Sequence, residues 1–346
     1  MNYPFKSKGV NLMKRTIALI LTAVLLLSVS SALSGCGAQG DRVVIYTAAE
    51  EERIAYLNEA LQKQFPGTEI VFQSLGTGQL LAKLLAEGKN TGCDIFYDLE
   101  VVNAEIILES APELFADLSG CDFSVYDESV MGYGHKKYAV NGKTDGALLV
   151  NTALLQEKGL PVPKTYDDLL NPAYRGLIAI PSPKSSGTGY SLYNGIVTML
   201  GAEEGSAYFD KLNANIKEYT TSGSAPVKSV VRGDAAIGFG LLWQCVAYAG
   251  ENPGMQVVIP DNKAPFGLFT MGIISGHETR QAVKDVFDYL FNTLNRTQVV
   301  RFNPDRIYTE QGKPEIPGYP EGFEEIAMSH LFDNKYKQDL LDKWKF

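Results

Sequence analysis

The sequence predicts an α/β fold in two lobes, each with a mostly parallel sheet flanked by helices. Two runs of alternating strand and helix patterns indicate this fold, one beginning at Arg42 and the other near Gly176. The length agrees with it. Once residues 1–35 are set aside as a leader, about 310 residues remain, enough for two lobes of ordinary domain size.

The first run predicts a β-α-β-α-β unit. Residues 42–47 (RVVIYT) are short and β-branched, as in a buried strand. Residues 50–65 place apolar side chains every three or four positions, which is helical spacing, and the glutamates at 50–52 suit a helix N-terminus. Pro66 ends this helix. A strand at 68–75, a helix at 79–87 and a strand at 93–97 are expected next.

The second run predicts a further set of strands and helices. The strands are expected at 176–181, 217–221, 235–242, 255–259 and 266–275, and the helices at 188–200, 204–216, 227–232 and 278–294. The proline-rich tail from residue 303 is expected to close with a helix that reaches Trp344.

The leader has the pattern of a secretory signal that ends in a lipid-attachment site. Lys14 and Arg15 precede an apolar run at 17–29, which is shorter than the roughly 20 residues of a membrane-spanning helix. The run leads into residues 33–36 (LSGC), which resemble the bacterial lipoprotein signal and imply a lipid on Cys36. An ordinary signal peptide with a chance cysteine is the alternative, and the chain could start at Met1 or Met13. We expect a signal peptide at 1–35, a tether at 36–41 and an extracytoplasmic protein anchored to the cell membrane.

Charge and cysteine content narrow the class of protein. The leader carries four basic residues and no acidic one, so its removal lowers the formal net charge from −9 to −13. So acidic a chain is a poor partner for nucleic acid. Cys93, Cys121 and Cys245 show no zinc-ligand spacing, and a Cys93–Cys121 disulfide stays open.

Three polar, glycine-rich segments each follow a predicted strand and precede a predicted helix, at 74–78 (SLGTG), 185–189 (SSGTG) and 221–226 (TSGSAP). Unpaired N–H groups in the first turn of a helix bind anions, glycine lets a ligand approach the backbone, and hydroxyls add donors. Ordinary helix capping explains any one segment alone. The three together predict a site for a phosphate, phosphonate or carboxylate group.

Few residues in the chain could support catalysis. The only histidines are His135, His277 and His330, and the sequence contains neither an HxxxH motif nor a GxSxG elbow. We therefore expect no enzymatic reaction and no cofactor, with an extracellular enzyme kept as the second alternative function.

Three longer motifs, at 185–190 (SSGTGY), 219–228 (YTTSGSAPVK) and 232–238 (RGDAAIG), resemble one family. They are similar to ABC-importer solute-binding proteins of the iron(III)-transport-labelled group, which includes receptors for hexose phosphates and 2-aminoethylphosphonate. The resemblance implies a periplasmic-binding-protein type II fold, with a hinge between the lobes, a ligand in the cleft and an ABC permease as partner. Lobe 1 is then expected at 42–145 and 266–320, lobe 2 at 146–265, and a C-terminal helix at 321–346. We expect a monomer.

Ferric-ion receptors of this group use paired tyrosines, helped by a histidine and an acidic residue. Here the segment 235–243 contains no tyrosine and the turn at 47–50 no histidine, although Tyr97, Asp98 and Glu100 resemble part of an iron site. We therefore predict a small anionic solute and no bound metal. A ferric ion or ferric chelate is the first alternative.

The predicted ligand-binding residues come from the turns that follow the strands. Asp98, with Glu100, is expected either to bind a ligand amine or to be a solvated acid at a helix start, and Trp243 is expected to pack on the carbon chain of the ligand. The remaining predicted ligand-binding residues are Thr47, Ala48, Gly76, Thr77, Gly78, Ser185, Ser186, Gly187, Thr188, Ser222, Gly223, Ser224 and Ala225.

Overall fold

The computed structural model describes residues 41–131, 136–328 and 330–346. The predicted leader, Cys36 and all but the last residue of the tether lie outside the described residues, as does His135. Residues Val43–Phe346 form one compact unit. Within the described ranges, no helix has both the length and the apolar composition that a membrane crossing requires.

The described strands form one nine-stranded sheet in the order β2-β1-β3-β10-β4-β7-β5-β6, with β8 also paired to β4. A separate two-stranded sheet joins β9 and β11. The strands are β1 (Arg42–Thr47), β2 (Glu69–Ser74), β3 (Ile95–Glu100), β4 (Ala139–Asn151), β5 (Ile178–Pro181), β6 (Ile216–Thr220), β7 (Ile237–Leu241), β8 (Met255–Val258), β9 (Lys263–Ala264), β10 (Phe266–Ile273) and β11 (Glu324–Glu325).

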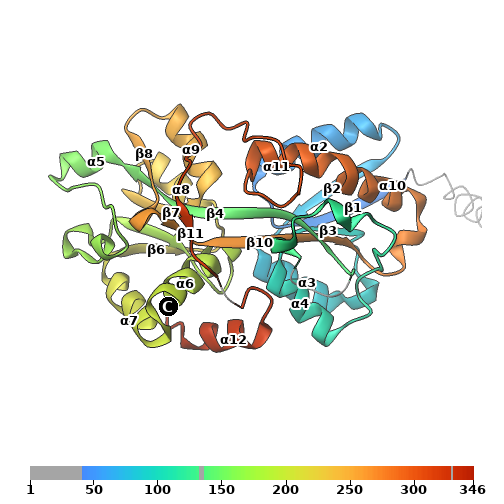
Figure 1. The fold of residues 1–346 in the computed structure, drawn as a ribbon, viewed down its shortest axis with the longest axis horizontal. Coiled ribbons are helices and arrows are strands. Elements are labelled where there is room, and N and C mark those ends of the chain that lie inside the picture. Colours follow the sequence, from blue (N-terminus) through green and yellow to red (C-terminus); the bar gives the residue numbers. More distant parts are fainter. Residues whose placement is uncertain (1–40, 132–135, 329) are drawn as a thin grey trace, which may run out of the picture. The chain divides into compact units, whose positions relative to one another are not determined.

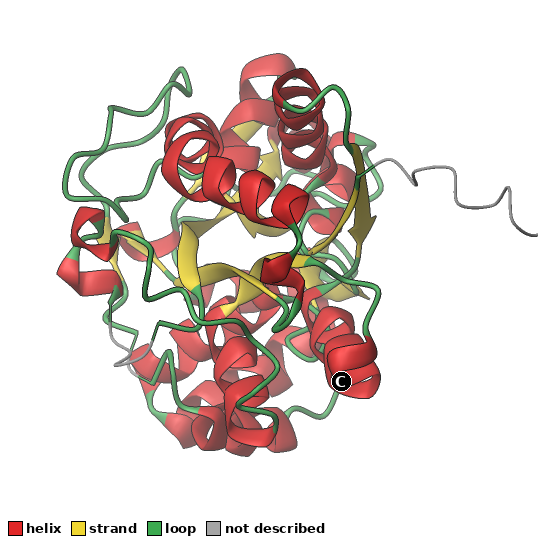
Figure 2. Ribbon diagram, turned by 90° about the vertical axis from the view of Figure 1, so that its right-hand side faces the viewer, coloured by secondary structure: helices red, strands yellow, loops and turns green. Residues whose placement is uncertain are grey.

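Helices cover both faces of the sheet (Figures 1 and 2). They are α2 (Glu51–Gln64), α3 (Thr77–Glu87), α4 (Val101–Ser110), α5 (Thr152–Glu157), α6 (Gly187–Leu200), α7 (Ala202–Leu212), α8 (Ala225–Val231), α9 (Leu242–Glu251), α10 (Gln281–Tyr289), α11 (Asn295–Phe302) and α12 (Asn334–Lys343). The α/β fold class predicted from the sequence is therefore confirmed.

Two large clusters of buried apolar side chains define two lobes. The cluster of lobe 1 draws on residues 43–140 and 268–308. That of lobe 2 draws mainly on residues 148–239, together with Val102, Leu340 and Trp344. The C-terminal helix α12 thus contributes to the core of lobe 2. The lobe bounds stated from the sequence stay a prediction.

Strand β4 belongs to both lobes. Its first half pairs antiparallel with β10, and its second half pairs antiparallel with β7 and β8. β10 in turn pairs antiparallel with β3 (Figure 1). The sheet is therefore mixed, although the pairings of β1 with β3 and of β5 with β6 and β7 are parallel as expected.

Strand β4 was not predicted from the sequence, because its centre (NGKTDG) has the composition of a turn. The two glycines serve packing instead. A Cβ at Gly146 would lie 2.3 Å from the Phe239 ring, so only glycine lets β4 and β7 pair at this point.

Other differences concern element boundaries. The predicted strand at 235–242 ends at Leu241, where the unpredicted helix α9 follows directly. Helix α4, with Glu100 as its N-cap, was expected only as one of the two alternatives for Asp98 and Glu100. The predicted helix at 278–294 begins at Gln281 and continues through a π-helical turn at Leu290–Leu294 into α11. Cys93, Cys121 and Cys245 are free thiols.

A pair of buried carboxyl groups lies where β4 passes between the lobes. The Asp145 N–H donates to Asp305 Oδ2 at 3.0 Å, and the Tyr319 hydroxyl donates to Asp305 Oδ1 at 3.1 Å. Burial raises the pKa of both carboxyl groups, and for Asp145 the nearby Asp305 raises it further. The pair therefore retains a proton at a higher pH than an exposed carboxyl would. The hydrogen bonds of Asp305 link the segment after α11 to strand β4.

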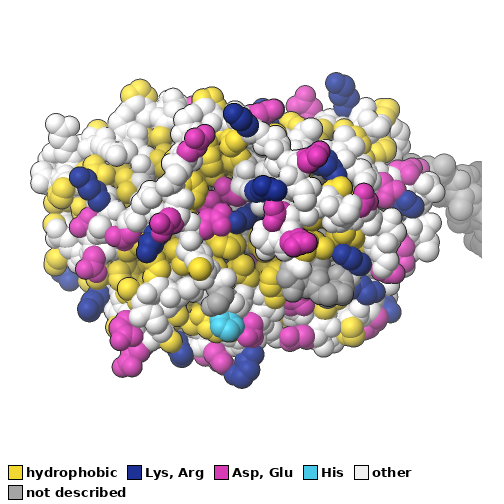
Figure 3. All heavy atoms as spheres, in the orientation of Figure 1, with side chains coloured by type: hydrophobic (Ala, Val, Ile, Leu, Met, Phe, Trp, Pro, Cys, Tyr) yellow, Lys and Arg dark blue, Asp and Glu magenta, His cyan; other side chains and the backbone are white. Residues whose placement is uncertain are grey.

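The surface seen in Figure 3 carries interspersed acidic and basic side chains over both lobes, without an extended basic area. This face offers no continuous track of positive charge of the kind that a nucleic-acid backbone requires.

Candidate ligand-binding site

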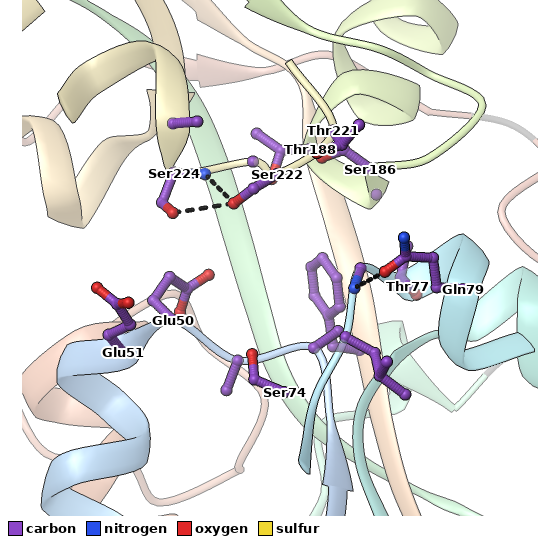
Figure 4. Close-up of a pocket in the computed structure, with 18 of the residues that line it drawn as sticks. Glu50, Glu51, Ser74, Thr77, Gln79, Ser186, Thr188, Thr221, Ser222 and Ser224 are labelled. Atoms are coloured by element: carbon purple, nitrogen blue, oxygen red, sulfur yellow. Dashed lines mark hydrogen bonds between the residues drawn. The ribbon is translucent and has the colours of Figure 1, made fainter. Parts of the chain in front are cut away.

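Four loops meet around a cavity of about 450 Å³ between the lobes (Figure 4). Two belong to lobe 1, between β1 and α2 and between β2 and α3. Two belong to lobe 2, between β5 and α6 and between β6 and α8. Each loop lies at the carboxyl end of its strand, which is where α/β sheets bind ligands. Phe269, on the crossing strand β10, adds an apolar ring to the wall.

The first turns of α3 and α6 face this cavity. Thr77 begins α3, and Gly187 and Thr188 begin α6. N–H groups in a first turn have no partner within their own helix, and that end of the helix is positive. Ser186 caps α6, since its hydroxyl accepts from the Gly189 N–H at 3.3 Å. The arrangement favours an anion held by backbone N–H groups.

The turn before α8 adds hydroxyl groups to the same wall. Ser222 Oγ lies 3.1 Å from Ser224 Oγ and accepts from the Ser224 N–H at 3.4 Å (Figure 4). A Cβ at Gly223 would lie 2.3 Å from Thr188 Oγ1. Glycine at this position therefore lets the turn and the start of α6 share one cavity.

Glu50 and Glu51 line the cavity beside α2, across from Thr77 in the view of Figure 4. Glu50 accepts from Arg53 Nη1 at 3.2 Å. Burial raises the pKa of the Glu50 carboxyl to about 7, against the opposing effect of the Arg53 charge. Near neutral pH this residue can therefore either accept from a ligand donor or stay protonated.

Arg53 is fully buried beneath this wall, and its two terminal nitrogens pair with acidic partners. Its two terminal nitrogens donate to the two oxygens of Asp98, each at 2.9 Å, and Asn141 Nδ2 donates to Asp98 Oδ1 at 2.9 Å. A buried pair with this two-point geometry holds its members in place. Neither charge is free to contact a ligand.

The lobes contact each other directly on two sides of the cavity. On one side, Lys228 of α8 pairs with Glu51 at 2.8 Å, and the Tyr248 hydroxyl donates to Glu52 at 3.0 Å. Glu51 is largely exposed, so this ion pair adds little to stability. On the other side, the Gly78 N–H donates to the Ser185 carbonyl at 3.4 Å. The structure therefore has the lobes closed on the cavity.

Most of the predicted ligand-binding residues line one cavity. They are Ala48, Gly76, Thr77, Ser186, Gly187, Thr188, Ser222, Gly223, Ser224 and Ala225.

The other five predicted residues do not line it. Thr47 is fully buried, and its hydroxyl accepts from the Ala49 N–H. Gly78 lies at the contact between the lobes, and Ser185 faces a smaller cavity of about 190 Å³ behind the first.

For Asp98 and Trp243 the prediction is corrected by packing. Asp98 faces Arg53 instead of the cavity, and its companion Glu100 pairs with Lys337 at 2.6 Å. Trp243 lies in α9 and packs on Phe302 with ring centroids 5.3 Å apart.

Nine lining residues were not among the predicted set: Ala49, Glu50, Glu51, Ser74, Leu75, Gln79, Thr221, Lys228 and Phe269. Ser74, Leu75 and Thr221 lie within the glycine-rich segments that carried the prediction. Glu50 and Glu51 were interpreted only as helix-start acids. Phe269 had no sequence signal, since its position depends on where β10 crosses.

Among the described residues, no group of three or more His, Cys, Asp or Glu side chains lies close enough together to hold a metal ion. The described residues that line the cavity include no tyrosine.

Comparisons with known proteins agree with this architecture. The family model described as "Bacterial extracellular solute-binding protein" matches residues 48–293. An uncharacterized protein of Haemophilus influenzae is 26% identical over 268 residues, which is 72% of this chain and 73% of that protein.

Solved structures share the fold. The periplasmic binding protein P5PA has a TM-score of 0.76 at 24% identity, covering 88% of this chain and 98% of its own. AfuA from Actinobacillus pleuropneumoniae, with exogenous fructose-6-phosphate bound, has a TM-score of 0.78 at 20% identity, with coverages of 88% and 97%. Iron-bound HitA from Pseudomonas aeruginosa has a TM-score of 0.66 at 17% identity, with coverages of 88% and 100%.

The contact at Gly78 predicts a substitution that opens the lobes. A Cβ there would lie 2.9 Å from the Lys184 carbonyl oxygen across the lobe boundary, so Gly78→Ala should disfavour the closed arrangement by about 1–3 kcal/mol. Small-angle X-ray scattering should give a larger radius of gyration for this variant than for the wild type. Gly67→Ala is the matched control, because nothing lies within 4 Å of its added methyl group. Equal radii for all three proteins would contradict the closing role of Gly78.

Proposed function

The chain belongs to the bacterial extracellular solute-binding proteins, and from this membership we propose that it captures a small solute with a phosphonate or phosphate group and delivers it to an ABC permease. The solute binds in the cavity between the lobes, and the protein acts as a monomer. Binding stabilises the closed arrangement, which the permease recognises.

One observation carries the proposal. The first turns of α3 and α6 and the serine-rich turn before α8 meet at one cavity, although they come from both lobes. Together they offer backbone N–H groups and hydroxyls, which suit the oxygens of a tetrahedral anion. Lys228 is the one basic side chain among the described lining residues, and Glu51 already pairs with it. Neutral donors therefore carry most of the recognition.

The structural relatives support two solute classes. AfuA holds fructose-6-phosphate and HitA holds iron, according to their descriptions. The cavity of this chain favours the first class, because its described lining is rich in donors and lacks phenolic oxygen, which ferric iron prefers. The family comprises binding proteins, and we propose that no reaction takes place here.

The two acidic residues of the cavity wall, Glu50 and Glu51, narrow the class of the proposed solute further. Glu50 and Glu51 lie across the cavity from Thr77, so a solute with an anion at one end and an ammonium at the other would satisfy both walls. The amine-binding role that the sequence assigned to Asp98 and Glu100 passes to Glu50. We therefore place aminoalkylphosphonates first among the solutes.

A screen of thermal stability tests the proposal. The purified protein should unfold at a higher temperature with phosphonates or sugar phosphates. At a ligand concentration a hundred times Kd, binding should raise the free energy of unfolding by about 3 kcal/mol. Mass spectrometry should recover the solute unchanged. Small carboxylates and ferric salts form the comparison arms. Stabilisation by ferric salts alone, or consumption of the solute, would overturn the proposal.

The titration of Glu50 predicts a pH dependence that distinguishes a zwitterion from a plain anion. Since its pKa is about 7, Glu50 gains negative charge as the pH rises through neutrality. The affinity for 2-aminoethylphosphonate divided by that for ethylphosphonate should then rise on the order of tenfold between roughly pH 6 and pH 8. Because both ligands carry a phosphonate group, the effect of phosphonate ionisation on affinity largely cancels in this ratio. Glu50→Gln should flatten the profile, and a wild-type ratio that stays flat or falls would contradict the amine-binding role.

The lipid anchor is proposed from the leader sequence alone. A lipid on Cys36 would hold the protein at the outer face of the cell membrane while residues 42–346 bind the solute. Cys36→Ala should shift the protein from the membrane fraction to the soluble fraction and leave solute affinity unchanged. Retention of the variant in the membrane fraction would show that the anchor lies elsewhere.

A further inference from the structure

The C-terminal helix α12 packs in the core of lobe 2 and also contacts lobe 1 near the ligand site. Leu340 and Trp344 are buried in the core of lobe 2, and the Tyr193 hydroxyl donates to the Leu340 carbonyl at 3.1 Å. One turn earlier, Lys337 projects against α4 of lobe 1. Figure 1 shows α12 lying along both lobes. The helix also lies outside the residues that match the family model.

Lys337 is a buried cation with a complete set of partners. Only 5% of the residue is exposed. Its Nζ donates to Glu100 Oε2 at 2.6 Å and to Asn103 Oδ1 at 2.9 Å, and it lies 4.4 Å from the centroid of the Tyr190 ring. An ammonium group can only donate hydrogen bonds. The oxygen of the Asn103 amide must therefore face Lys337.

The orientation of the Asn103 amide determines which hydrogen bonds the Thr77 hydroxyl can make. Because its oxygen is held by Lys337, its NH₂ group points the other way and donates to Thr77 Oγ1 at 3.2 Å. The same hydroxyl oxygen accepts from the Glu100 N–H at 3.1 Å. A hydroxyl has two acceptor positions and one proton, so both acceptor positions of Thr77 are filled. The proton of Thr77 is left to donate, and Thr77 lines both the ligand cavity and the smaller cavity of about 190 Å³.

We propose that Lys337 is a positioning residue that makes the Thr77 hydroxyl a hydrogen-bond donor toward the anionic group of the solute. The inference rests on the proposed function only in taking the solute to be an anion. Without the ammonium, the Asn103 amide can rotate by half a turn and accept the Thr77 proton. Thr77 would then present its one unfilled lone pair to the solute, because the other still accepts from the Glu100 N–H, and a lone pair repels an anion.

A double-mutant cycle tests this chain of contacts. Inorganic phosphate and methylphosphonate serve as the probes, and calorimetry on the purified protein gives their affinities. Lys337→Met should weaken binding about tenfold, the effect of one hydrogen bond to a charged group. In a Thr77→Val background the same substitution should weaken binding no further. Equal losses in both backgrounds would show a merely structural role and overturn the inference.

Two further variants distinguish a specific loss of affinity from a loss of folding. Lys335→Met changes an exposed lysine of the same helix, whose side chain pairs with Asp339, and should leave affinity unchanged. Lys337→Met alone leaves Glu100 buried without its cation, so Lys337→Met combined with Glu100→Gln removes both charges together. The combined variant should show the same loss of affinity as the single one. Wild-type affinity in the combined variant would overturn the inference.

A ligand-free readout separates this inference from the proposed function. If the wild type binds neither probe, the anion assignment fails, and thermal unfolding then decides the positioning role. The drop in unfolding temperature caused by Lys337→Met should be smaller in the Thr77→Val background, because Asn103 no longer has a hydroxyl to orient. Equal drops would overturn the inference whatever the solute is.

Discussion

The architecture depends on one constraint, which is that both lobes share strand β4. This strand pairs with β10 along its first half and with β7 and β8 along its second, so a single hydrogen-bonded sheet joins two separate hydrophobic cores. Because the ladder is continuous, the loops at the carboxyl ends of β1 and β2 face those of β5 and β6 across one cavity.

The charges around the cavity are largely neutralised before any solute arrives. Arg53 is held by Asp98, Lys337 by Glu100, and Lys228 by Glu51. Buried ions are tolerated when they are paired in this way. What remains for the solute is a wall of N–H and hydroxyl donors from three turns, together with the carboxyl group of Glu50. Recognition by fixed dipoles depends on geometry, so in our proposal a residue as distant as Lys337 influences how the solute is bound.

The C-terminal segment is part of the folded unit. Trp344 packs in the core of lobe 2 against Tyr193 and Phe209, and Lys337 reaches α4. The final helix was predicted from the sequence, but its contacts with lobe 1 were not. These contacts also change the interpretation of Glu100, which serves as the partner of a helix more than 200 residues later in the chain.

The sequence by itself determined the α/β class, most strand and helix positions, and the three glycine-rich turns, because these depend on local periodicity and on the chemistry of helix starts. Ten of the fifteen predicted ligand-binding residues line one cavity for that reason. Only the tertiary structure decided where the acids face. Asp98 and Glu50 both contact Arg53, but Asp98 takes both of its terminal nitrogens, whereas Glu50 takes one and also lines the cavity. Strand β4 could not be predicted for a similar reason, since Gly146 makes room for the ring of Phe239, which lies 93 residues away in the chain.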